Sequence, residues 1–107
     1  MNIQPFTLET LSSTVRVLLR ADGEKSTIEP GTMTEYRRAL NAAAVDVVAL
    51  RHLGADPLYV MLLDDLGHDK ALPVNAEATR LYHANCKPNT THTIRGDVVI
   101  APDSDFA

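Results

Sequence analysis

Runs of branched and other apolar residues predict five strands, at residues 15–20, 25–29, 45–50, 58–63 and 93–101. The run at 58–63, LYVMLL, is the most apolar in the chain, and we expect it in the middle of the sheet. Asp22-Gly23 separates the first two runs and predicts a hairpin turn. Gly96 lies inside the last run and predicts a bulge or turn that divides this strand.

The segment after Pro30-Gly31 has the pattern of a capped helix. Thr32 is the expected N-cap, and Glu35 three residues later completes a capping box. The apolar stripe of this helix comprises Met33, Tyr36, Leu40, Ala43 and Ala44. The opposite face comprises Arg37, Arg38 and Asn41.

A second helix is predicted from Asn75 to about Asn85. Asn75 is the expected N-cap, because an asparagine oxygen can accept a hydrogen bond from an amide two or three residues further on. Ala78, Leu81 and Tyr82 would then face the core.

This order of elements predicts the α+β class, with a mainly antiparallel sheet of about five strands and two helices in one compact domain over residues 1–107. A doubly wound sheet would need a helix at most crossovers, and the pattern offers only two. Residues 1–13 are expected to form a loose lead-in, and the sequence leaves open whether the acidic tail at 103–107 is ordered.

The composition is that of an ordinary globular chain, with 45% hydrophobic and 22% charged residues. A single cysteine, Cys86, excludes an internal disulfide framework and fits a reducing compartment. The N-terminal stretch lacks the basic and apolar regions of an export signal, and no run approaches the roughly 20 apolar residues of a membrane span. We therefore expect a cytoplasmic protein without membrane contact.

The net charge of −4 comes entirely from the second half of the chain. Residues 1–54 hold six acidic and six basic residues, whereas residues 55–107 hold eight acidic and four basic ones. A nucleic-acid binder needs a basic footprint to displace counterions, so this distribution disfavours direct DNA or RNA binding. It favours a basic protein partner, contacted through Asp64, Asp65 and Asp69.

Asp64, Asp65, His68 and Asp69 are the nearest approach to a metal cluster, but their spacing matches no EF-hand, zincin or facial triad. A solvated turn explains them better, so we expect no metal. The five glycines are scattered singly and form no phosphate loop, so no cofactor is expected either.

The catalytic alternatives are weak. His52, His83 and His92 fall on separate predicted elements, and Cys86 follows a helix end beside no evident base. No catalytic residue is therefore assigned. Arg37 and Arg38, with Arg51 and His52, could instead line a basic patch near the first helix that holds a phosphate or an acidic partner; exposed arginines on an outer helix face are the simpler explanation.

The chain resembles a family of small proteins common in bacteriophages, other mobile elements and actinobacteria, catalogued as domain-of-unknown-function family 3846. The matching segments are Arg16–Gly23, Thr34–Leu50, Leu58–Gly67, Leu72–Thr79 and Ile94–Ile100. The most specific positions are Leu72-Pro73-x-Asn75-x-x-Ala78-Thr79 and Gly96-Asp97. The chain departs in having Asp64-Asp65-Leu66-Gly67 where the family has an Asn-Glu-x-Gly turn, and a longer loop before the last strand. The resemblance implies a small accessory protein encoded by a phage or prophage, and it transfers no site residue.

Two function classes follow. The first is a non-enzymatic accessory protein that binds and inhibits a host macromolecule, such as a defence-system component, in the host cytoplasm. The second is a protein that binds a nucleotide-like ligand, or an enzyme that acts on a nucleotide, through Arg37, Arg38, His52 or His68. A homodimer could complete the pocket of the second class.

Overall fold

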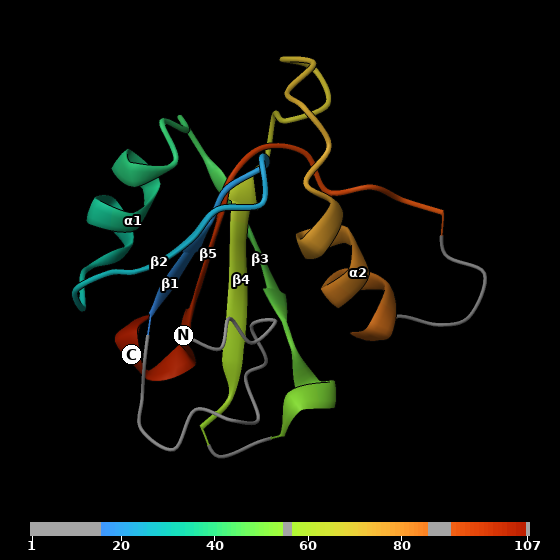
Figure 1. Ribbon diagram of the computed structural model, residues 1–107. Helices are drawn as coiled ribbons and strands as arrows, with labels where there is room; N and C mark the ends of the chain where they lie inside the picture. Colours follow the sequence, from blue (N-terminus) through green and yellow to red (C-terminus); the bar gives the residue numbers. More distant parts are fainter. Residues whose placement is uncertain (1–15, 55–56, 86–90, 107) are drawn as a thin grey trace, which may run out of the picture.

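Five antiparallel strands form one sheet in the computed structural model, which describes residues 16–54, 57–85 and 91–106 (Figure 1). The strands are β1 (Val17–Leu19), β2 (Lys25–Thr27), β3 (Val45–Ala49), β4 (Tyr59–Asp64) and β5 (Val98–Pro102). Their order across the sheet is β2-β1-β5-β4-β3. With the helices α1 (Met33–Ala39) and α2 (Ala76–Asn85), this arrangement confirms the predicted α+β class. The predicted β1–β2 hairpin is also confirmed.

The middle strand of the sheet is β5, so the placement of the 58–63 run there is wrong. That run forms β4, which lies between β5 and the edge strand β3. Every residue of β4 and of β5 is buried. A continuous apolar run indicates a strand that is buried on both faces of the sheet. Every interior strand is buried in this way, so the run does not identify the central strand.

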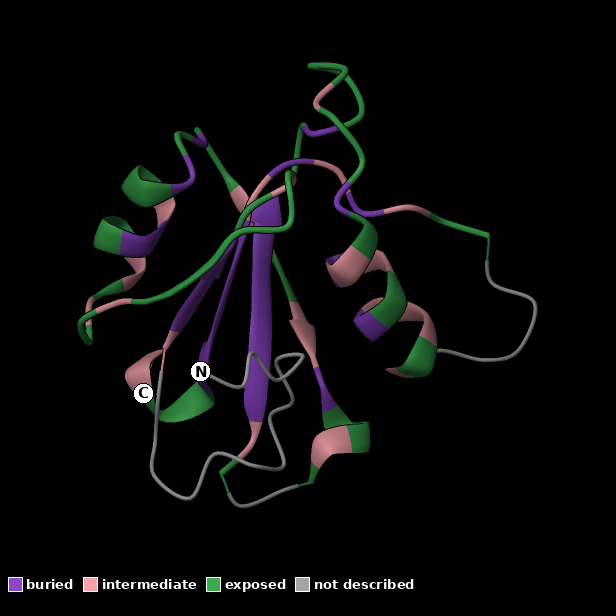
Figure 2. Cartoon of the chain, in the orientation of Figure 1, coloured by how far each residue is buried: buried purple, intermediate pink, exposed green. Residues whose placement is uncertain are grey.

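The two helices cover opposite faces of the sheet, as Figures 1 and 2 show. Side chains alternate along each strand, so neighbouring residues of β4 and β5 enter different cores. The core under α1 contains Leu18, Tyr36, Leu40, Ala42, Val60, Leu62, Val99 and Ala101. The core under α2 contains Leu19, Leu50, Tyr59, Met61, Leu63, Ala78, Leu81, Ile94, Val98 and Ile100.

Helix α1 begins as predicted and ends earlier than its apolar pattern indicates. Both hydrogen bonds of the Thr32–Glu35 capping box are present. The helix ends at Ala39, and Asn41 takes a left-handed conformation with φ of 52°. This reversal takes the chain out of the helix, so Ala43 and Ala44 are exposed and their assignment to the apolar stripe is wrong.

The start of α2 is fixed by Asn75, whose side chain is almost fully buried at 1% exposure. Its Oδ1 accepts a hydrogen bond from the Ala78 amide at 3.0 Å, which confirms the predicted N-cap. Its Nδ2 donates to the carbonyl oxygens of Leu19 and Gly96, each at 3.0 Å. One amide group therefore joins α2 to β1 and to the segment that leads into β5.

Gly96 divides the last predicted strand, as expected. Its φ of 84° is unfavourable for residues with a side chain. A Cβ atom at this position would also lie 2.8 Å from Leu72 Cδ1. The Gly96 amide donates to the Pro73 carbonyl oxygen at 2.8 Å, so the segment before β5 is held against the segment before α2.

The acidic tail forms the 3-10 helix η3 over Asp103–Phe106, a point that the sequence left open. Arg16 donates two hydrogen bonds to Asp105, at 2.6 and 3.0 Å. The Tyr36 hydroxyl donates to the same carboxylate at 2.6 Å. The hydrogen bonds from Arg16 lower the pKa of Asp105 despite its burial, so the carboxylate stays charged at neutral pH.

The outer edge of β3 is partly closed by side chains. The Leu50 amide donates to the Tyr59 carbonyl oxygen, and hydrogen-bonded residues alternate along an antiparallel strand. The backbone polar groups of Val47 and Ala49 therefore point away from β4. The Val47 amide donates to Asp46 Oδ1, and Asn85 Nδ2 donates to the Ala49 carbonyl oxygen. These contacts and the Asp46 charge hinder the addition of another strand at this edge.

Replacement of Asn75 by alanine should lower the free energy of unfolding by about 3 kcal/mol, because it removes a cap and two further hydrogen bonds from a buried site. Thr32→Ala is the matched control, since it removes an exposed cap and should cost only about 1 kcal/mol. Urea unfolding of both variants measures the difference. Equal losses would contradict a joining role for Asn75.

The contribution of Asp105 to stability should depend on pH. Because its pKa is lower in the folded chain than in the unfolded one, the contribution is complete above the unfolded value of about 4 and is lost as the pH falls through the folded value. Asp105→Asn should therefore destabilise the protein by about 2 kcal/mol at pH 7 and much less at pH 2.5.

Urea unfolding at the two pH values tests this difference. Asp103→Asn changes an exposed carboxylate in the same 3-10 helix and should have little effect at either pH. A cost of Asp105→Asn that did not change with pH would rule out the ion pair as its source.

Candidate functional site

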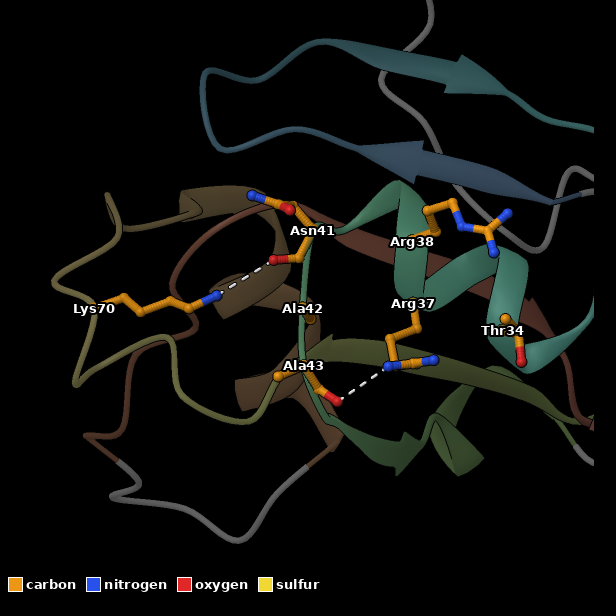
Figure 3. Close-up of a pocket in the computed structure, with 7 residues that line it drawn as sticks. All are labelled: Thr34, Arg37, Arg38, Asn41, Ala42, Ala43 and Lys70. Carbon is orange, nitrogen blue, oxygen red and sulfur yellow. Dashed lines mark hydrogen bonds between the residues drawn. The ribbon is translucent and has the colours of Figure 1, made fainter.

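A cavity of about 520 Å³ opens beside the C-terminal end of α1, between this helix and the turn at residues 65–71 (Figure 3). Its lining comprises Thr34, Arg37, Arg38, Asn41, Ala42, Ala43 and Lys70. Figure 3 shows Lys70 reaching in from one side, with the arginines on the helix at the other and the two alanines between them. We call this the α1 cavity.

The arginine end of the α1 cavity has unused hydrogen-bonding capacity. Arg37 donates one hydrogen bond, from Nη1 to the Ala43 carbonyl oxygen at 3.2 Å. Arg38 is exposed and makes no hydrogen bond or ion pair with the described residues. Hydrogen bonds with Thr32 lower the pKa of Glu35, and the positive charge of Arg38 lowers it further. Each guanidinium group offers five N–H donors, so most of them point to solvent or to a ligand.

The opposite end is held by an ion pair between Lys70 and Asp64. Lys70 Nζ donates to Asp64 Oδ2 at 2.6 Å and to the Asn41 carbonyl oxygen at 3.3 Å. Burial opposes the charged form of Asp64, but the hydrogen bonds from Lys70 and from the Leu66 amide outweigh it and lower the pKa of this carboxylate. The charge of Lys70 is therefore balanced within the protein.

The three carboxylates predicted to contact a partner have different environments. Asp64 ends β4 and is only 4% exposed, so it cannot present its charge to a partner, and its inclusion in the predicted contact surface is corrected. Asp65 and Asp69 are exposed in the turn that follows. The spacing of these residues cannot reveal this difference, because it depends on the strand continuing one residue past the apolar run.

The proposed extension of the basic patch to Arg51 and His52 is wrong. Both residues belong to the 3-10 helix η2 (Arg51–Leu53), which follows β3 at the opposite end of the sheet from the turn that carries Lys70 (Figure 1). His52 is engaged there with Asn85, through its backbone amide at 3.2 Å and its Nδ1 at 3.1 Å. Only Arg37 and Arg38 of the predicted basic residues line the α1 cavity.

His83 and His92, which the sequence places on separate elements, lie near each other and near His68, whereas His52 contacts Asn85. The rings of His68 and His92 are 4.9 Å apart, and Tyr82 lies 5.5 Å from His92. His68 Nε2 is 3.1 Å from the Thr93 carbonyl oxygen, and His83 Nε2 is 2.6 Å from that of His92. A carbonyl oxygen only accepts, so both nitrogens carry protons and hold the segment before β5. These contacts do not place His68 at the α1 cavity.

Four of the seven acidic residues that the structure describes in the second part of the chain are paired with bases. The pairs are Asp64–Lys70, Glu77–Arg80, Asp97–Arg20 and Asp105–Arg16. Two of these pairs bring in arginines from the first part of the chain. The acidic excess of residues 55–107 is therefore a weaker guide to the surface charge than the sequence indicates.

Within residues 16–54, 57–85 and 91–106, no three or more potential metal ligands of the His, Cys, Asp or Glu type converge. In the same part of the chain, no helix has both the length and the apolar character needed to cross a bilayer. Cys86 lies outside the described residues.

No family model, curated protein or solved structure matches this chain. The resemblance to the phage family stays a prediction.

Lys70 is the residue of the α1 cavity that sequence reasoning missed. The sequence indicates the position of Lys70 only indirectly. Asp64 and Lys70 are six residues apart across a turn that contains Gly67, so the turn brings their opposite charges together. Thr34, in the first turn of α1, and Asn41, just after its end, also line the cavity, and the sequence predicted no functional role for either.

Asp64 and Asp65 are adjacent in sequence and should respond differently to mutation. Asp64→Ala should lower the free energy of unfolding by about 2 kcal/mol, because it leaves the Leu66 amide and Lys70 without their buried acceptor. Asp65→Ala should change it by less than about 0.5 kcal/mol. Thermal or urea unfolding distinguishes the two, and equal effects would contradict the structural assignment of Asp64.

Proposed function

We propose that this protein acts by binding, without catalysis, and that the α1 cavity holds an anionic ligand. The observation that carries the proposal is the charge of the lining: every charged side chain among its described lining residues is a cation, namely Arg37, Arg38 and Lys70. An arginine guanidinium group binds phosphate and carboxylate groups well, because it offers two parallel N–H donors.

The shape of the cavity supports a small ligand. A volume of about 520 Å³ falls within the range of small-molecule sites, roughly 300–1,000 Å³. The lining is mainly polar, which favours a hydrated, charged ligand over an apolar one. This proposal keeps the ligand-binding alternative of the sequence, with Arg37 and Arg38 as its residues, and leaves out His52 and His68.

The acidic-surface hypothesis has less support. Asp64 is buried, and four of the seven described acids in the second part of the chain are paired within the protein. Exposed Asp65 and Asp69 keep this hypothesis open to test by charge reversal. A basic host protein as partner, inhibition of a defence system and the host cytoplasm as location stay predictions.

The test is a titration with inorganic phosphate followed by NMR of the backbone amides. Shifts should concentrate at Thr34, Arg37 and Arg38, and they should weaken with added salt, because exposed charges are screened. Arg38→Gln should reduce the affinity about tenfold, since hydrogen bonds to charged groups contribute about 1.5–3 kcal/mol.

Arg51→Gln is the matched control, because Arg51 is also exposed but lies on η2 and should leave the affinity unchanged. Phosphate-dependent shifts confined to other parts of the molecule would overturn the proposal. So would an affinity that Arg37→Gln and Arg38→Gln leave unchanged.

A further inference from the structure

We infer that the ligand of the α1 cavity is a phosphorylated sugar or similar polyol, bound with its phosphate at Arg37 and Arg38 and its hydroxyl groups toward Asn41 and Lys70. This inference rests on the proposed function and adds the chemical class and the orientation of the ligand. It follows from the unequal balance of charge at the two ends of the cavity.

At the arginine end, no ion pair with a described residue neutralises the positive charge, and the Glu35 carboxylate interacts with Arg38 only through its charge. Arg37 donates only to a neutral carbonyl oxygen, and Arg38 has no ion pair among the described residues. Arg37 and Arg38 both line this end of the cavity from consecutive positions of α1, and Figure 3 shows their side chains leaving the helix in different directions. A dianionic phosphate satisfies this end better than a neutral group does.

At the other end, the positive charge is already matched. Asp64 stays charged, because the Lys70 hydrogen bond and the Leu66 amide keep its pKa low, so the Lys70–Asp64 pair is neutral as a unit. Lys70 has three N–H donors, of which one goes to Asp64 and another to the Asn41 carbonyl oxygen. A second anionic group would meet the Asp64 charge here, whereas a hydroxyl group can accept the remaining hydrogen bond.

The middle of the cavity offers no support for a nucleobase. Ala42 and Ala43 lie between the two ends, and no aromatic side chain is among the described lining residues. Proteins commonly hold bases by stacking them on aromatic rings or on arginine planes. The arginines here are at the phosphate end, so the ligand is recognised through its phosphate and hydroxyl groups.

The experiment compares inorganic phosphate, ribose 5-phosphate, AMP and ribose by NMR titration at pH 8, where the phosphate esters are close to fully ionised. Ribose 5-phosphate should bind about tenfold more tightly than inorganic phosphate, because two or more added hydrogen bonds stabilise it. AMP should bind within about twofold of ribose 5-phosphate, and ribose alone should bind far more weakly.

Variants separate the two ends. Arg38→Gln should weaken phosphate and ribose 5-phosphate equally. Asn41→Gly should reduce the preference for ribose 5-phosphate over inorganic phosphate by about threefold, and glycine tolerates the φ of 52° at this position. Lys70→Gln should have the same effect, and Asn41→Gly covers the case in which loss of the Asp64 partner unfolds the protein.

The outcomes are distinct. Equal affinities for inorganic phosphate and ribose 5-phosphate would overturn the polyol assignment and leave the anion-binding function standing. AMP binding much more tightly than ribose 5-phosphate would overturn it in favour of base recognition. If no phosphate compound binds, the proposed function fails together with this inference.

Discussion

The buried amide of Asn75 is the interaction on which the arrangement of this fold depends. A buried polar group is costly unless its hydrogen bonds are made, and Asn75 makes them with three different segments: α2, β1 and the approach to β5. β1 comes from the first part of the chain and β5 from the last, so this side chain fixes elements that are adjacent in space and distant in sequence. Its position also sets the end of the connection that carries Lys70.

The motif that carries the family resemblance acquires a physical explanation from these contacts. Pro73 and Gly96 are joined through their backbone groups, and Leu72 occupies the space that a side chain on residue 96 would need. Ala78 is fully buried, and Thr79 Oγ1 accepts a hydrogen bond from the Ile94 amide at 2.9 Å. The spacing of this motif therefore describes one junction between α2 and the segment before β5.

Local features of the sequence predicted the parts of the fold that depend on local chemistry. The capping box at Thr32, the cap at Asn75 and the break at Gly96 each need only a few neighbouring residues, and each was predicted. The central position of β5 depends on the pairing of β1 with a strand about 80 residues away, which no local pattern reports.

The candidate site shows the same limit. The sequence predicted a basic patch at Arg37 and Arg38 from their place on α1. Arg51 and His52 were added to this patch only because they follow the next strand in the sequence. A strand of five residues separates α1 from η2 and carries η2 to the other end of the sheet. Lys70 reaches the cavity because the chain returns along β4, which runs antiparallel to β3.

The net charge of the chain does not indicate the charge near α1, because charged groups interact mainly with their close neighbours. Asp105 and Asp97 pair with Arg16 and Arg20, which removes two acids from the second half and two bases from the balanced first half. The buried carboxylate of Asp64 neutralises the positive charge of Lys70. What remains of the positive charge near α1 is concentrated in Arg37 and Arg38, since neither forms an ion pair with the described residues, although Arg38 is near enough to Glu35 for its charge to lower the pKa of that carboxylate. A chain of net charge −4 can thus carry a local group of cations, because four of its acids form ion pairs with other bases and Arg37 and Arg38 form none with the described residues.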